Sequence, residues 1–162
     1  MPASSTTPPA QSETDDRPVE AIDYAALNAA YGSLLVTLVL AARQRGRHDV
    51  EPIAGRELLP LGLATFALAK LVVHEKIEAW VRQPFVARTA DGERHPRGHG
   101  LRYATGELLT CTRCVGGWSA LALVGLRVTS PPASRVVTGV LCASAINDFA
   151  QAGFRWLCNR AG

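Results

Sequence analysis

The feature that most constrains this chain is a run of 19 residues without a charge, Tyr24 to Ala42. At a rise of about 1.5 Å per residue, a helix of this length is roughly as long as the hydrocarbon core of a bilayer is thick. A helix on the surface of a soluble protein would carry a face of Lys, Glu or Arg, which this run lacks. The run therefore predicts a transmembrane helix. Its small residues Ala25, Ala29 and Ser33 recur every four positions, which favours close approach of a second helix along that face.

Three more apolar runs follow, and charges are concentrated between them. The runs cover residues 58–73, about 107–128 and 136–157. The second is interrupted only by Lys70, and the third is long enough to span only if its helix begins upstream, near Gly106 or Glu107. Two prolines in "TSPPAS" (129–134) predict a turn, because proline cannot continue a helix. The last two runs are thus expected to form an antiparallel helical hairpin.

This pattern predicts an all-α integral membrane bundle with three or four transmembrane helices, formed by a single domain over residues 23–160. Residues 1–22 are expected to be a disordered tail, since the segment up to Pro18 is acidic, rich in Ser, Thr and Pro, and has no large apolar side chain. The alternative is a soluble helical bundle, in which runs of 12–16 apolar residues would simply be buried helices. The uncharged first run favours the membrane.

An amphipathic segment follows the second run. In residues 74–84, extended by Phe85, the side chains Ile77, Trp80 and Val81 fall on one face of a helix. We expect this helix to lie in the lipid headgroup region, although packing against protein would produce the same periodicity. The rest of the segment, 85–106, is expected to be a basic loop.

The distribution of Lys and Arg predicts the orientation. If all four runs cross, ten basic residues lie on the side of the 74–114 loop and the two termini, and six lie on the other side. This majority predicts a multi-pass protein of the cell membrane with a cytoplasmic 74–114 loop. The flanks of the first run alone favour the reverse orientation, which a re-entrant second run would reconcile. Acidic residues are mixed into the basic loop. We therefore expect the loop to face anionic lipid, and we do not expect it to bind nucleic acid.

Two long stretches carry a family resemblance. "LATFALAKLVVHEKIEAWVRQPF" and "GLRYATGELLTCTRCVGGWSALAL" resemble the bacterial membrane proteins grouped as domain of unknown function 1360, some of which are associated with sporulation. The matching motif comprises Gly106, Glu107, Leu108, Leu109, Cys111, Cys114, Gly116 and Trp118. Ala67 departs from the pattern, since an arginine often stands there, whereas Lys70 keeps the next basic position. The resemblance covers about 60% of the chain and implies a multi-pass membrane protein without implying a reaction.

Cys111 and Cys114 allow three interpretations. A redox pair would have a thiolate stabilised by a helix N-terminus and by Arg113, but thiols on a cytoplasmic face stay reduced. A zinc clamp would combine the two cysteines with His95 and His99, a ligand set that suits tetrahedral zinc. In the third interpretation, which we favour, the cysteines are small residues that let a helix start pack tightly. On this view no cofactor is expected, and zinc is the one candidate.

Polar residues within the membrane runs complete the candidate sites. Asp148, next to Asn147, lies deep in the last run. An ionisable side chain at this depth is costly, so it is expected to have a charged or polar partner or a functional role. Lys70, the basic residue inside the second run, is its candidate partner, and pairing with Asp148 requires staggered helices. The sequence favours a non-enzymatic membrane component that contacts lipid and other membrane proteins or itself. It leaves open whether the protein is an enzyme.

Overall fold

The computed structural model describes residues 19–45, 53–75, 79–88 and 94–161. These form a predominantly helical structure, which confirms the predicted all-α class. The helices are α1 (Ala21–Arg45), α2 (Gly55–His74), α3 (Ala79–Arg82), α4 (Leu101–Thr110), α5 (Thr112–Thr129) and α6 (Pro131–Ala161). Two short strands, β1 (Val86–Arg88) and β2 (Arg94–Pro96), pair antiparallel with Val86 opposite Pro96.

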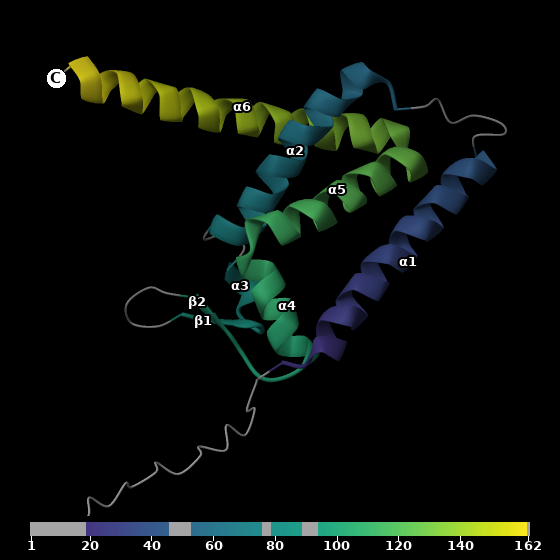
Figure 1. Cartoon of the computed structure of the whole chain (residues 1–162). Helices are drawn as coiled ribbons and strands as arrows, with labels where there is room; N and C mark the ends of the chain where they lie inside the picture. The colour runs from purple at the N-terminus through teal and green to yellow at the C-terminus, as the bar shows by residue number, and fades with distance from the viewer. Residues whose placement is uncertain (1–18, 46–52, 76–78, 89–93, 162) are drawn as a thin grey trace, which may run out of the picture.

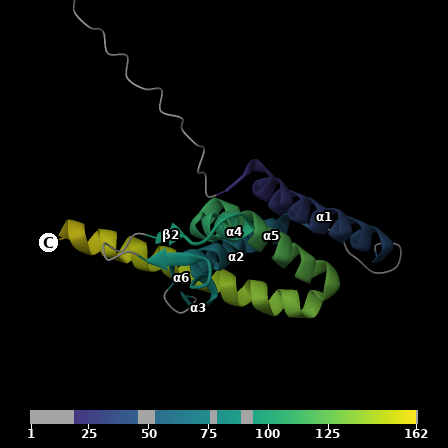
Figure 2. The ribbon, with the colours of Figure 1, turned by 90° about the horizontal axis from the view of Figure 1, so that it is seen from below.

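The long helices form three layers (Figures 1 and 2). Helices α2, α5 and α6 contact one another. Within the described residues, the main contacts of α1 are with α4 and α5. In the view from below, α2 and α5 lie between α1 on one edge and α6 on the other. The hairpin, α3 and α4 gather at one end, and the C-terminal part of α6 extends beyond the other helices. Every residue of α6 from Phe149 onward is exposed.

Two of the described helices, α1 and α2, are long and apolar enough to cross a membrane. A third span is possible if α4 and α5, bent by 92° at their junction, count as one broken span. The sequence predicted three or four spans. Helix α6 does not meet the same criterion, because Asn147, Asp148 and Arg155 dilute its apolar residues.

The structure describes part of the segment after the second run. Helix α2 continues to His74, and α3 covers Ala79–Arg82 within the interfacial helix expected over 74–84; residues 76–78, Ile77 among them, lie outside the described residues. The expected 85–106 loop contains the β1–β2 hairpin and the start of α4 at Leu101. This segment is held in place by side-chain contacts with the end of α2 and with α4, which are described below. Hydropathy alone does not predict these contacts.

Two small clusters form the core. Leu61 and Ala64 of α2 pack against Leu123 of α5, and Leu68 and Leu141 cover them. Nearer the hairpin, Ala69 and Val73 pack against Val115, with Val72 and Leu108 alongside. Alanines on α2 allow the helices to approach closely, so burial is concentrated on α2 and α5.

Candidate functional site

The sharp bend between α4 and α5 lies at Cys111. This residue is extended, with φ −95° and ψ 105°, and its N–H donates to the carbonyl of Glu107 at 3.1 Å. The Thr110 hydroxyl donates to the same carbonyl at 2.9 Å. These bonds satisfy a carbonyl that the end of α4 would otherwise leave open, so one helix ends and the next begins within a single residue.

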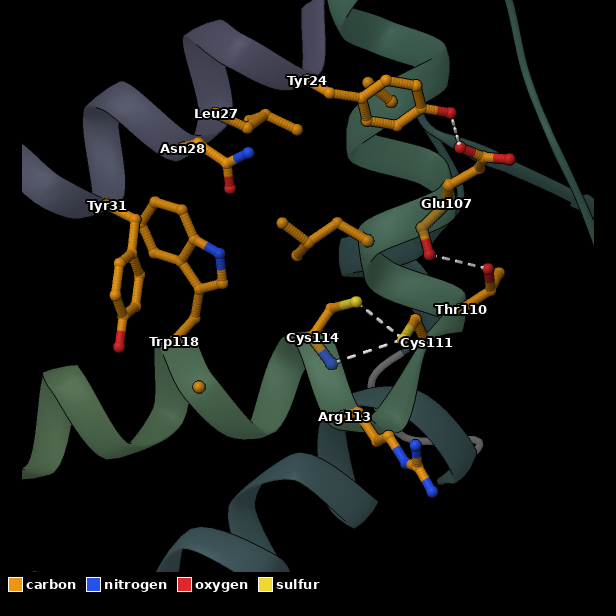
Figure 3. A pocket seen from close by; sticks show the side chains of 13 residues that line it. Tyr24, Leu27, Asn28, Tyr31, Glu107, Thr110, Cys111, Arg113, Cys114 and Trp118 are labelled. Atoms are coloured by element: carbon orange, nitrogen blue, oxygen red, sulfur yellow. Dashed lines mark hydrogen bonds between the residues drawn. The ribbon is translucent and has the colours of Figure 1, made fainter.

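Cys111 also caps α5. Its sulfur accepts a hydrogen bond from the N–H of Cys114 at 3.3 Å and another from the Cys114 thiol, with the two sulfurs 2.7 Å apart (Figure 3). Both cysteines are free thiols. The Cys114 thiol, together with the Cys114 N–H and the positive charge of Arg113, lowers the pKa of the Cys111 thiol. A position at a helix N-terminus acts in the same direction, because it stabilises a thiolate relative to the thiol.

A cavity of about 650 Å³ opens beside the cysteine pair, between α1, α4 and α5. Its walls carry aromatic rings: Tyr31 and Trp118 contact edge to face with ring centroids 5.3 Å apart. At the α4 side, the Tyr24 hydroxyl donates to the Glu107 carboxylate. Figure 3 shows both thiols and these side chains around the same space. The site thus combines an apolar, aromatic wall with a thiol pair.

The proposed zinc ligands are not assembled. His95 lies on β2 and His99 in the turn before α4, and both are exposed. Among the described residues, no three His, Cys, Asp or Glu side chains come together in a group that could hold a metal ion. The structure keeps Cys111 and Cys114 adjacent but does not bring the two histidines to them.

Most of the motif residues contribute to the packing around this bend. Glu107 accepts from Tyr24, Leu108 joins the cluster around Val73, and Trp118 contacts Tyr31. Gly106 is buried against the hairpin: a Cβ there would lie 2.6 Å from the carbonyl oxygen of Phe85. Leu109 is partly buried. At Gly116, by contrast, an added Cβ would meet no atom within 4 Å.

Lys70 and Asp148 are brought together where α6 crosses α2. The lysine Nζ lies 2.8 Å from Asp148 Oδ2 and 3.7 Å from Glu75 Oε1. Phe66 and Phe149 stack beside this ion pair, with centroids 5.2 Å apart. Asn147 is exposed. Lys70 of the second apolar run therefore neutralises Asp148 of the last one.

Three arginines of residues 74–114 bind backbone carbonyls, a role that the sequence analysis missed. Arg82, only 6% exposed, donates to the carbonyls of Val72 and Glu75. Arg94 donates to the carbonyl of Val73, and Arg102 donates twice to Pro84. Basic residues after a helix C-terminus can satisfy its last carbonyls, and this is the one sequence signal that could have indicated the role.

Comparison with known proteins identifies the family. Residues 60–154 match the family described as protein of unknown function (DUF1360). The chain belongs to this family. It is also 35% identical over 91 residues to the sporulation protein YjcA of Bacillus subtilis (strain 168), an alignment that covers 51% of this chain and 77% of that protein. No solved structure matches the chain. The family match extends from α2 into α6 and includes the whole motif, whereas α1 lies outside it.

Proposed function

We propose that this protein is an integral, multi-pass component of the bacterial membrane that acts through contacts with other membrane proteins or with itself. Helix α1 carries the proposal. None of the residues in its most apolar 18-residue window is buried within the chain, so Leu34, Val36 and Leu40 are all exposed. Apolar surface of this extent is stable only against lipid or another protein.

The two faces of α1 suggest how such contacts form. Leu27, Tyr31 and Leu38 face α4 and α5 and are partly buried. The small residues Ala25, Ala29 and Ser33 are exposed and therefore available to a second helix. Small-residue faces of this kind support close helix–helix packing in lipid. Similarity to a sporulation protein adds sporulation as a proposed setting.

Fractionation and cross-linking test the proposal. We expect the untagged protein to sediment with membranes, to resist carbonate extraction and to be released by detergent. A photo-cross-linking amino acid at Ala29 should give discrete adducts. The matched control is Ala30, also exposed but about 100° around the helix, which should give fewer. Recovery in the supernatant without detergent contradicts the membrane role, and equal yields at the two positions contradict contact through this face.

We also propose that residues 74–114 face the cytoplasm. The test uses a variant in which Cys142 and Cys158 are serine, leaving Cys111 and the exposed Cys114. A membrane-impermeant maleimide should label these thiols in lysed cells and not in intact cells. Labelling of intact cells reverses the proposed orientation.

Thiol–disulfide exchange is a second candidate function, supported by the arrangement at the bend. The sulfurs of Cys111 and Cys114 are 2.7 Å apart, and one of them caps a helix. Oxidation of the pair to a disulfide would release two protons and two electrons, and a quinone in the lipid could accept both as it becomes a quinol. Acid quenching followed by alkylation measures the oxidised fraction in cells. A pair that stays fully reduced in every growth condition excludes this function.

A further inference from the structure

A second cavity lies at the end of the molecule opposite the hairpin. It has a volume of about 230 Å³ and forms where α2 begins, α5 ends and α6 begins (Figure 1). The polar side chains that line it belong to Arg56, Glu57, Arg127, Ser134, Arg135 and Thr138. Nothing in the thiol site or in the α1 contacts involves these residues, so the cavity requires its own explanation.

The charge in this cavity is positive. Arg127 donates to both oxygens of the Glu57 carboxylate, each at 3.3 Å, and these two charges cancel. Arg56 and Arg135 have no ion pair with an acid among the described residues. Within the part of the chain that the structure describes, two guanidinium groups therefore remain available, and guanidinium is the side chain best suited to paired hydrogen bonds with phosphate oxygens.

Two further observations point to an anion. Thr138 lines the cavity and is only 9% exposed, yet its hydroxyl has no hydrogen-bond partner within the described part of the chain. Helices α2 and α6 both begin here, and no side chain caps the N-terminus of α2 at Ala54. The uncapped N–H groups at the start of α2 and the positive end of its dipole favour a bound anion, whereas α6 begins with Pro131 and Pro132, which have no N–H to donate.

We propose that this cavity binds a phosphate group, presented by the headgroup of an anionic phospholipid. Phosphate offers several acceptor oxygens, which matches two unpaired arginines, an unpartnered hydroxyl and a helix start. The choice of a lipid as its source rests on the membrane placement proposed above. The apolar span of α2 begins at Gly55, which places the arginines at the level of lipid phosphates.

Native mass spectrometry of the full chain, released from a neutral detergent, tests the proposal. The probes are phosphatidylglycerol, diacylglycerol with the same acyl chains, and inorganic phosphate. We expect the protein to retain phosphatidylglycerol and not diacylglycerol, and inorganic phosphate to reduce this retention. Arg135→Gln should weaken binding by about tenfold, because one charged hydrogen-bonding partner is lost. Arg155→Gln, on an exposed part of the same helix, should leave binding unchanged.

Thr138→Val keeps the test decisive if Arg135→Gln does not fold. It removes the hydroxyl without changing the shape of the side chain, and it should weaken lipid retention while preserving the circular dichroism spectrum. Equal retention of diacylglycerol, or equal losses in Arg135→Gln and Arg155→Gln, overturns the site. Binding of inorganic phosphate without phosphatidylglycerol supports phosphate recognition and overturns the lipid source. Fractionation stays a separate test: a protein that remains in membranes but binds no phosphate refutes only this inference.

Discussion

Gly106 lies at a close contact between α4 and the hairpin, and replacing it with alanine tests how the motif holds these elements together. The added Cβ would lie 2.6 Å from the Phe85 carbonyl oxygen and 3.0 Å from Pro96 Cβ. Real Cβ atoms essentially never approach another atom as closely as the first distance. The Phe85 oxygen also accepts the Arg97 N–H at 2.7 Å, so it cannot move without loosening the hairpin.

The size of the effect follows from two opposing terms. Forcing a methyl group into a packed site costs about 1–3 kcal/mol. Alanine is favoured over glycine within a helix by about 1 kcal/mol, and this gain offsets part of the cost. Because backbone atoms of both Phe85 and Pro96 meet the new methyl group, we place the cost toward the upper end of its range. We therefore expect Gly106→Ala to lower the free energy of unfolding by roughly 1–2 kcal/mol.

Gly116 supplies the matched control. It belongs to the same motif and also lies within a helix, but an added Cβ there would meet no atom within 4 Å. Gly116→Ala should therefore gain the helix propensity without the clash. Thermal unfolding of both variants in a neutral detergent, followed by circular dichroism, measures the difference. If Gly106→Ala unfolds at the same temperature as Gly116→Ala, or above it, the proposed contact between α4 and the hairpin is wrong.

Two further predictions concern the charged and thiol groups. A double-mutant cycle of Lys70→Met and Asp148→Asn should show a favourable coupling of about 0.5–1 kcal/mol in the free energy of unfolding. The coupling is expected to be modest because both side chains are about one-third exposed. A coupling of zero would mean that the ion pair does not stabilise the contact between α2 and α6. Because Cys114 lowers the pKa of Cys111, Cys114→Ala should shift the rise in alkylation of Cys111 to higher pH, as measured by peptide mass spectrometry with Cys142 and Cys158 replaced by serine. An unchanged profile means that Cys114 does not stabilise the thiolate.

Local composition is enough to predict the long helices. Residues 24–42 and 58–73 lie within α1 and α2, because an uninterrupted apolar run has few other stable conformations. The Lys70–Asp148 contact could also be predicted, because Asp148 lies deep in the last run and Lys70 is the basic residue of the second run. The small residues of α1 are exposed, so the predicted packing of a second helix on this face stays a prediction.

The bend at Cys111 could not be predicted from hydropathy. The apolar run continues across it, and Gly106 and Glu107 were expected near the start of one helix. They instead lie within α4, which ends at Thr110. The ending depends on a threonine hydroxyl and a backbone N–H that share the carbonyl of Glu107. Thr and Cys are common within helices, so their identities alone do not specify a break.

The contacts of the arginines near the hairpin could not be predicted from the sequence either, and they give these basic residues a second role. Arg82 and Arg94 satisfy carbonyls at the end of α2, and a carbonyl has the same chemistry at every position of the sequence. A count of positive charges treats such arginines as solvated residues that orient the chain. Orientation is set as the chain inserts, before these contacts form, so the same residues can first direct the insertion of α2 and then cap it. Neutral substitution of Arg82 should therefore destabilise the fold even where the orientation is unchanged, which separates the two roles.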